Sequence, residues 1–213
     1  MPEIYLTLLR HGRSQADDDG VYEGRFDSPL TETGRAQAAR RAGAWQAQGV
    51  HFDRIICSPL RRAHETAQII GTALGAEIEP DPDWMEWDHG LLAGLPRAEA
   101  DTRFPRPAFL SPHTRRGVTG ETDWECYSRA ARAVEKVVHR GAGSYLVVAH
   151  GGILNQALHA VFAIAPQPNN YGAWFAFGDD GYLRLRYQPD QHCWHVLEFN
   201  PGFAEPLSST MPI

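Results

Sequence analysis

The chain has 213 residues, of which 43% are hydrophobic, 10% aromatic and 22% charged. This composition is typical of a soluble globular protein and excludes a fibrous or disordered one. No apolar run approaches the roughly 20 residues that cross a bilayer, and the first residues lack the basic-then-apolar pattern of a secretory signal. We therefore expect no membrane association and a cytoplasmic location. The net charge of −6 argues against nucleic acid as a partner.

The cysteines and cations narrow the possible kinds of site. Cys57, Cys126 and Cys193 are far apart and form no CxxC pair, which argues against a disulfide scaffold or a thiolate zinc site. Lys136 is the only lysine among 20 Lys and Arg residues. An anion-binding site in this chain would therefore consist mainly of guanidinium groups and histidines.

Predicted strands and helices alternate along most of the chain. Short apolar runs predict strands at residues 4–9, 53–57 and 145–149. Alanine-rich or amphipathic stretches predict helices at residues 34–48, 59–74, 122–139 and 151–162. Ser58-Pro59 has the form of an N-cap followed by proline at the first helical position. Thr122 and Glu125 have the spacing of a capping box.

Two regions differ from this alternation. Residues 79–120 contain six prolines and predict a long irregular excursion with one short helix at 97–103. Residues 173–177, 182–187 and 193–199 are strand-like and separated by turn sequences. The first of these three could be an edge strand used for dimerisation or could be covered, so both a monomer and a homodimer remain open.

This order of elements predicts one α/β domain over residues 1–213. We expect a three-layer α/β/α sandwich with a mainly parallel central sheet. Residues 79–120 would form a short lid insertion over one end of the sheet, and the last strands would add an antiparallel edge.

Ligands of such sheets bind beyond the carboxyl ends of the strands. The first predicted strand runs into Arg10-His11-Gly12, the second into Ser58 and a helix start bearing Arg61 and Arg62, and the third into His150-Gly151-Gly152. Helix N-termini at the last two positions offer free N–H groups. The fold thus gathers histidines, arginines and helix ends at one edge, and their natural occupant is a compact dianion such as phosphate.

Each of these groups also has a plain structural interpretation when taken alone. His11 could be a buried structural histidine, and Arg62 could be a solvated helix residue paired with Glu65 or Glu23. Further histidines could suggest zinc, but no liganding motif supports a metal site, and we expect none. These candidates are His89, His113, His192 and His195.

The whole set resembles the histidine phosphatase superfamily, also called the phosphoglycerate-mutase-like family. The resemblance covers residues 8 to about 158, with a plausible match in the terminal strands. The matching segments are Leu8-Leu9-Arg10-His11-Gly12; Gly24, Asp27, Leu30-Thr31 and Gly34; Ser58-Pro59-Leu60-Arg61-Arg62-Ala63 with Thr66-Ala67; Glu86 with Gly90 and Gly94; Gly120-Glu121-Thr122; and Val148-Ala149-His150-Gly151-Gly152.

The resemblance implies a phosphomonoester hydrolase acting through a phosphohistidine on a small phosphorylated metabolite. His11 would be the nucleophile and Glu86 the proton donor, with Asp88 as the fallback acid. The expected phosphate- and substrate-binding residues are Arg10, Arg62, His150, Gly151, Gly24 and Arg97. Because guanidinium and imidazole donors can hold the transferred charge, no metal and no cofactor are required.

Three positions depart from the family pattern. Arg13 replaces the usual acidic or amide residue, Asp17 stands in place of the usual asparagine, and Glu23 stands where a glutamine is common. A carboxylate at position 17 would repel phosphate, so the phosphate-contact role of that position is not carried over to Asp17. The fine specificity is therefore open.

Two other functions are weighed against hydrolysis. A cofactor-dependent phosphoglycerate mutase usually carries a longer lid and an asparagine where this chain has Gly152, although Arg97 and the Arg115-Arg116 pair resemble mutase positions. The third possibility is a catalytically inactive module that binds phospho-ligands. The short segment between Gly94 and Gly120 leaves access for water and favours the phosphatase.

Overall fold

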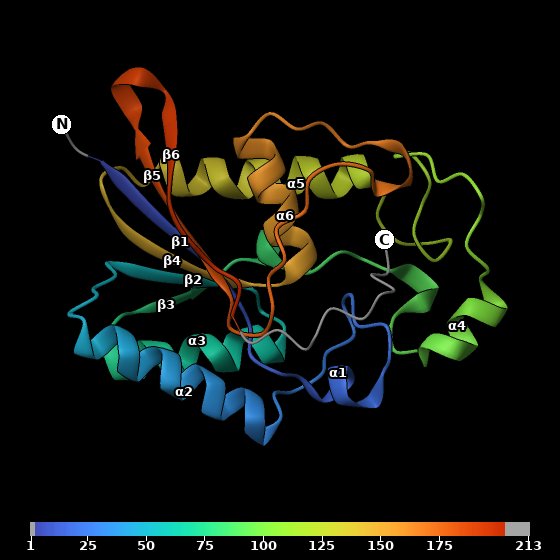
Figure 1. Ribbon diagram of the computed structural model, residues 1–213, viewed down its shortest axis with the longest axis horizontal. Coiled ribbons are helices and arrows are strands. Elements are labelled where there is room, and N and C mark those ends of the chain that lie inside the picture. The colour runs from blue at the N-terminus through green and yellow to red at the C-terminus, as the bar shows by residue number, and fades with distance from the viewer. Residues whose placement is uncertain (1–2, 203–213) are drawn as a thin grey trace.

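The structure, a computed structural model, describes residues 3–202 and has three layers (Figure 1). The central sheet has six strands in the order β3-β2-β4-β1-β5-β6. Their bounds are β1 Ile4–Arg10, β2 Arg54–Cys57, β3 Ile78–Pro80, β4 Gly143–Ala149, β5 Tyr182–Gln188 and β6 Cys193–Asn200. The strands from β3 to β1 are parallel, whereas β5 and β6 pair antiparallel at the edge. The expected α/β fold with a mainly parallel sheet is confirmed.

Helices cover both faces of the sheet. The bounds are α1 Gln15–Asp19, α2 Glu32–Ala47, α3 Arg61–Leu74, α4 Arg97–Arg103, α5 Asp123–Val138 and α6 Gly151–Val161. Figure 1 shows α2 and α3 on one side of the sheet and α5 and α6 on the other, while α4 lies beyond the end of the sheet. No helix within residues 3–202 has the length and apolar character needed to cross a membrane.

Two apolar cores follow from these layers. Between the sheet and α2 and α3, Trp45 and Phe52 pack with alternate residues of β2 and β4. On the other face, Leu6, Leu8 and Val147 pack against α5 and α6. Because successive strand residues point to opposite faces, the wholly apolar strands supply both cores at once. This burial holds the carboxyl ends of the strands in register.

Strand register brings the predicted site residues together. Arg10 is paired with Ala149, so the residues that follow them, His11 and His150, leave neighbouring strands side by side. Cys57 is paired with Val148, which places Ser58 next to the same edge. The prediction that one sheet edge gathers these groups is confirmed by the pairing of β1, β4 and β2.

Several predicted elements have different bounds or are absent. Residues 173–177 are not a strand, so the edge strand proposed for dimerisation is wrong; the peptide oxygens of Phe175 and Phe177 accept side-chain hydrogen bonds instead. Two short elements were not predicted: α1, which the Ser14 capping box begins, and β3, which pairs with β2 and occupies the start of the 79–120 excursion.

The start of α3 also differs from the prediction. Ser58 is not its N-cap, because the helix begins at Arg61 with Leu60 at the cap position. The first helical N–H, that of Arg61, donates to the Asp27 carboxylate at 2.7 Å. A loop far away in the sequence thus supplies the cap, and the Ser58 hydroxyl is left for another partner. The Thr122–Glu125 capping box at α5 is confirmed.

Candidate active site

The Nδ1 atom of the His11 ring is hydrogen-bonded to the backbone, whereas Nε2 is not. Its Nδ1 lies 2.7 Å from the carbonyl oxygen of Gly12, which can only accept, so Nδ1 carries the proton and Nε2 carries the lone pair. The side chain is 1% exposed. Burial, aided by the charges of Arg62 and Arg10, lowers the pKa of His11 well below its usual value. A neutral imidazole with an unprotonated Nε2 is the form that can act as a nucleophile.

His150 lies beside His11 and is oriented by Ser58. The two ring centroids are 5.0 Å apart, so both histidines can reach one tetrahedral anion. The Ser58 hydroxyl accepts the N–H of Leu60 and lies 2.8 Å from His150 Nε2. The Ser58 hydroxyl still has its proton to donate, so it can donate to Nε2, and in that arrangement the proton of a neutral ring lies on Nδ1. The Nδ1 atom is buried and has no hydrogen-bond partner among the described residues.

The guanidinium of Arg62 is fully buried and makes contacts from all three of its nitrogens. One terminal nitrogen donates to the carbonyl of Gly24 and the other to that of Phe26, each at 2.9 Å. Nε donates to His11 Nε2 at 3.2 Å. Gly24 has a φ of +50°, and a Cβ there would lie 2.9 Å from the carbonyl oxygen of Trp87. The 24–26 loop is therefore held by the same cation that contacts the nucleophile.

Arg10 approaches the histidines from the end of β1. One terminal nitrogen donates to the carbonyl of Phe177 at 2.9 Å. The other lies 3.4 Å from the Asp179 carboxylate and 3.6 Å from that of Asp17. These contacts fix the plane of the guanidinium, which can then offer its remaining N–H groups to an anion.

Glu86 is anchored to the first turn of α6. Its Oε1 accepts the N–H groups of Trp87 and Ile153, and its Oε2 accepts that of Gly152, at 2.8–2.9 Å. A Cβ on Gly152 would lie 2.6 Å from Glu86 Oε1. This contact is the structural reason for a glycine at position 152. The acid candidate and His150 are thus held by the same helix start, because α6 begins directly after His150.

The remaining predicted binding residues lie at different depths. A Cβ on Gly151 would meet only Arg10 Cδ, at 3.9 Å, so there is room for a small side chain at this position. Arg97 is exposed at the start of α4, with its guanidinium 5.1 Å from the ring centroid of Tyr22. It lies at the rim rather than beside the histidines.

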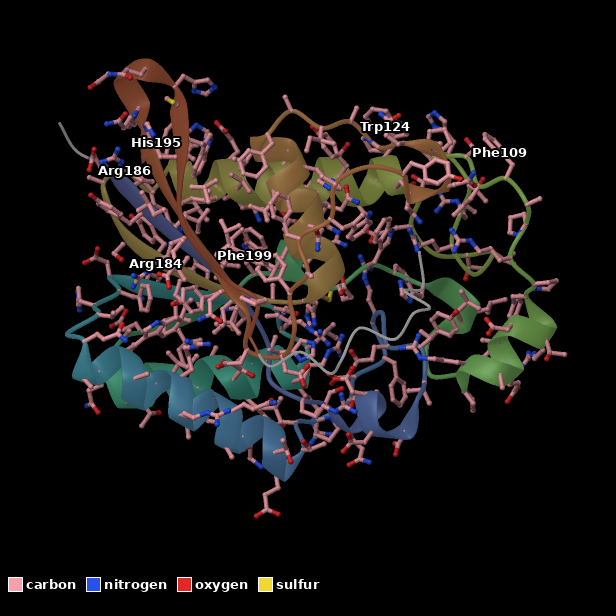
Figure 2. All side chains as sticks on the ribbon, in the orientation of Figure 1. Phe109, Trp124, Arg184, Arg186, His195 and Phe199 are labelled. Atoms are coloured by element: carbon pink, nitrogen blue, oxygen red, sulfur yellow. The ribbon has the colours of Figure 1, made fainter. Side chains whose placement is uncertain are left out.

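The mutase-like arginine pair and two of the four histidines weighed for zinc, His192 and His195, have other partners. The Nδ1 atom of His192 forms a hydrogen bond with the Tyr187 hydroxyl. Arg115 pairs with Glu125, and Arg116 packs over Trp87 and pairs with Asp123. His195 bonds to Gln188 on the β5–β6 hairpin, at the opposite end of the molecule from Trp124 and Phe109 (Figure 2). Within residues 3–202, no three His, Cys, Asp or Glu side chains are grouped so that they could hold a metal ion.

Sequence reasoning missed several polar side chains that support this site. Ser58 was interpreted only as a helix cap, and the roles of Ser14 and Thr66 were not anticipated. The Thr66 hydroxyl donates to the carbonyl of Arg62 and accepts the N–H of Gly12, which links α3 to the loop after β1. Asp179 was interpreted only as part of a turn. The position of Ser58 directly after a buried strand was the one available signal.

The comparisons with known proteins agree with this geometry. The family model for the histidine phosphatase superfamily (branch 1) matches residues 6–202. An adenosylcobalamin/alpha-ribazole phosphatase of Escherichia coli is 26% identical over 93% of this chain and 92% of its own length. Phosphoserine phosphatase 1 of Hydrogenobacter thermophilus is 30% identical over 73% of this chain and 74% of its own.

A solved structure supports the fold. A mycobacterial glucosyl-3-phosphoglycerate phosphatase, determined as a complex with VO3, superimposes with a TM-score of 0.74. It is 23% identical and covers 92% of this chain and 98% of its own. Since the family match spans nearly the whole of the described structure and follows the strand ends that carry His11, Arg62 and His150, this chain belongs to the histidine phosphatase superfamily.

Proposed function

We propose that this protein hydrolyses phosphate monoesters of small metabolites through a phosphohistidine formed on His11. It would be a metal-independent phosphatase of the histidine acid type, with Arg10, Arg62 and His150 holding the phosphoryl group and Glu86 acting as the proton donor. Its relatives are phosphatases with several different substrates, so we propose the class of substrate and no individual ester. We expect it to work in the cytoplasm, as a monomer or homodimer.

The first half of the reaction transfers the phosphoryl group to the enzyme. His11 Nε2 attacks phosphorus in line, the N–P bond forms, and the ester P–O bond breaks. Arg62 Nε, which contacts Nε2 in the structure, would turn its N–H toward a phosphoryl oxygen as the bond forms. The leaving oxygen takes a proton from the Glu86 carboxyl.

The second half releases phosphate. Water attacks the phosphohistidine and gives its proton to the Glu86 carboxylate, and the N–P bond breaks to leave His11 neutral again. Cations and N–H donors already fixed in the pocket would stabilise the charge on the equatorial oxygens. This supply of donors is the reason for proposing that no metal is needed.

One observation carries the proposal: within residues 3–202 the buried Nδ1 of His150 has no hydrogen-bond partner, and its ring lies beside that of His11, whose Nε2 is unprotonated. A buried donor without an acceptor is costly, and such groups in native proteins commonly serve a ligand. A phosphoryl oxygen bound between the two rings would accept from Nδ1 while phosphorus faces Nε2. Arg115 and Arg116, which resemble the arginine pair of the mutases, form ion pairs with Glu125 and Asp123 of α5, and this pairing argues against the mutase.

Hydrolysis of p-nitrophenyl phosphate tests the proposal. The His11→Ala variant should lose more than about 10³-fold in kcat/KM, because the nucleophile is absent. His139→Ala, at an exposed histidine directly after α5, is the matched control and should keep the wild-type rate. Equal rates in His11→Ala and wild type would end the enzyme interpretation and favour the binding module.

Two further assays test whether the reaction needs a metal and whether the protein is a phosphatase or a mutase. Activity should be unchanged by EDTA and inhibited by vanadate, and a loss of activity on chelation would contradict the metal-independent mechanism. With 3-phosphoglycerate and 2,3-bisphosphoglycerate, phosphate release should exceed isomerisation. The opposite result would make the protein a mutase.

A further inference from the structure

A carboxylate lies directly against the nucleophile. Glu23 Oε2 is 3.9 Å from His11 Nε2 and 3.5 Å from Arg62 Nε. A phosphoryl group in position for attack would sit about 3–3.5 Å from Nε2. Its oxygens would therefore come within contact distance of Glu23, and two anions would meet in a buried site if Glu23 were ionised.

The hydrogen bonds around Ser14 show that a proton is shared here. The Ser14 hydroxyl accepts the N–H of Asp17 at 3.1 Å and lies 2.9 Å from Asp17 Oδ2. It also makes a hydrogen bond with Glu23 Oε1. A hydroxyl has only one proton, so it can donate to one of the two carboxyl groups and not to both. The other contact is a hydrogen bond only if that carboxyl group itself carries a proton.

The surrounding charges place this proton on Glu23. Asp17 lies 3.6 Å from the Arg10 guanidinium, and its Oδ2 accepts the backbone N–H of Ser14 at 3.0 Å. Burial alone would raise the pKa of Asp17, but Arg10, His11 and the bonds from Ser14 lower it overall. For Glu23, burial and the neighbouring Asp17 raise the pKa more than Arg62 lowers it.

The charged and titratable groups that face Glu23 come from several elements. They are Arg10 at the end of β1, His11 directly after it, Asp17 in α1 and Arg62 in α3. The two arginines favour its ionised form, whereas Asp17 opposes it. Entry of a phosphoryl dianion would add a second opposing charge and shift the balance further toward the protonated carboxyl.

We propose that Glu23 is a further phosphate-binding residue that acts as a neutral carboxyl, so that the phosphoryl group and one proton are bound together. In the free site the Glu23 proton lies on Oε1 and is donated to the Ser14 hydroxyl, which donates to Asp17. When a phosphoryl group binds, the carboxyl can carry this proton on Oε2 and donate it to a phosphoryl oxygen, while the Ser14 hydroxyl turns from Asp17 to donate to Oε1. Ionised Glu23 instead occupies the arginine and histidine donors as an internal anion and competes with the substrate. This inference rests on the proposed function and assigns that site a preference for acidic conditions.

Sulfate binding tests the inference without turnover, because sulfate is a tetrahedral dianion whose charge is constant from pH 5 to pH 8.5. Titration calorimetry would measure its dissociation constant across this range. For the wild type, affinity should fall about tenfold per pH unit once Glu23 is ionised in the free enzyme. For Glu23→Gln, which keeps the shape and cannot ionise, the fall should be absent or much shallower.

Proton counting gives an independent readout. Sulfate binding measured in buffers of different ionisation enthalpy should show the wild type taking up more protons per sulfate than Glu23→Gln, with the difference approaching one in the pH range where the wild-type affinity falls tenfold per pH unit. Glu65→Gln, on an exposed ion pair of α3, should match the wild type. Asp17→Asn removes the charge that opposes ionisation, so its loss of affinity should move to lower pH.

The outcomes separate this inference from the function on which it rests. The same pH dependence and proton count in wild type and Glu23→Gln would overturn the role of Glu23, even if His11→Ala confirms the phosphatase. Sulfate binding that follows Glu23 in an enzyme that hydrolyses no phosphate ester would instead overturn the proposed function. The pH profile of kcat/KM for p-nitrophenyl phosphate should lose its steep alkaline fall in Glu23→Gln.

Discussion

The role of the glycine at position 152 can be tested by introducing a side chain there. In Gly152→Ala, the new Cβ would lie 2.6 Å from Glu86 Oε1 and 3.2 Å from its carboxyl carbon. Ordinary contact begins at about 3.4 Å, so the carboxylate has to retreat by about 0.8 Å. The obstacle is the end of a flexible side chain rather than backbone, and we therefore expect the variant to fold.

The expected effect is on proton donation. Because a catalytic group misplaced by about 1 Å can cost on the order of 10²-fold, kcat/KM should fall by about 10- to 100-fold for an alkyl phosphate. The p-nitrophenolate group leaves without needing a proton, so p-nitrophenyl phosphate should lose much less. The assay is kcat and KM for β-glycerophosphate and p-nitrophenyl phosphate at one pH, reported as the ratio of the two kcat/KM values, because kcat/KM depends on the first half-reaction and not on the water attack that both substrates share.

Gly151→Ala is the matched control on the preceding residue. A Cβ there meets only Arg10 Cδ at 3.9 Å and does not touch Glu86, so the wild-type ratio between the two substrates should be retained. If Gly152→Ala slows both substrates equally, or slows neither, Glu86 is not the proton donor held by this turn.

Three further substitutions test the supports of the site and fold. Arg62→Ala leaves the carbonyls of Gly24 and Phe26 without their donor, which should lower the free energy of unfolding by about 2–4 kcal/mol in urea titrations; a stability equal to wild type would contradict this reading of the buried contacts. Burial raises the pKa of Asp180 to about 7 despite its pairing with Arg41, so the folded chain holds a proton here that the unfolded chain releases near pH 4. The free energy of unfolding that this group contributes is present below about pH 4 and is lost as the pH rises to 7. Between pH 5 and pH 8, the free energy of unfolding of Asp180→Asn should therefore rise by about 2–3 kcal/mol relative to that of the wild type. Curves of unfolding free energy against pH that run parallel for the two proteins would refute the raised pKa. Thr122→Ala removes the capping box of α5 and should cost about 1 kcal/mol, seen as a fall of about 2–4 °C in Tm, whereas an unchanged Tm would show that the cap is not needed.

Local patterns in the sequence were sufficient for most elements. The apolar runs of β1, β2 and β4 and the capping box at Thr122 depend on neighbours in the chain, so their positions could be predicted within a few residues. The short helix α4 was predicted with its observed bounds, Arg97–Arg103. Elements held by distant partners were not: β3 has three residues and exists because it pairs with β2.

The loops show the same difference between what local patterns predict and what distant partners determine. The 173–177 segment has the composition of a strand, yet its backbone bonds to Asn155 and Arg10 instead of to another strand. Ser58 has the form of a helix cap, yet Asp27 binds the first N–H of α3. In both cases the backbone group forms its hydrogen bond with a side chain that is distant in the sequence, and not with the partner that the local pattern predicts.

The amino-acid sequence by itself determined which chemistry this protein carries, because parallel strands present their carboxyl ends at one edge and His11, Arg62 and His150 follow those ends. Only the tertiary structure decided the state of each group. The neutral ring of His11 depends on burial, the orientation of His150 depends on Ser58, and the raised pKa of Glu23 depends on burial and on Asp17. Such protonation states arise from desolvation and from charges a few ångströms away, and these distances are set by packing between segments that are remote in the chain.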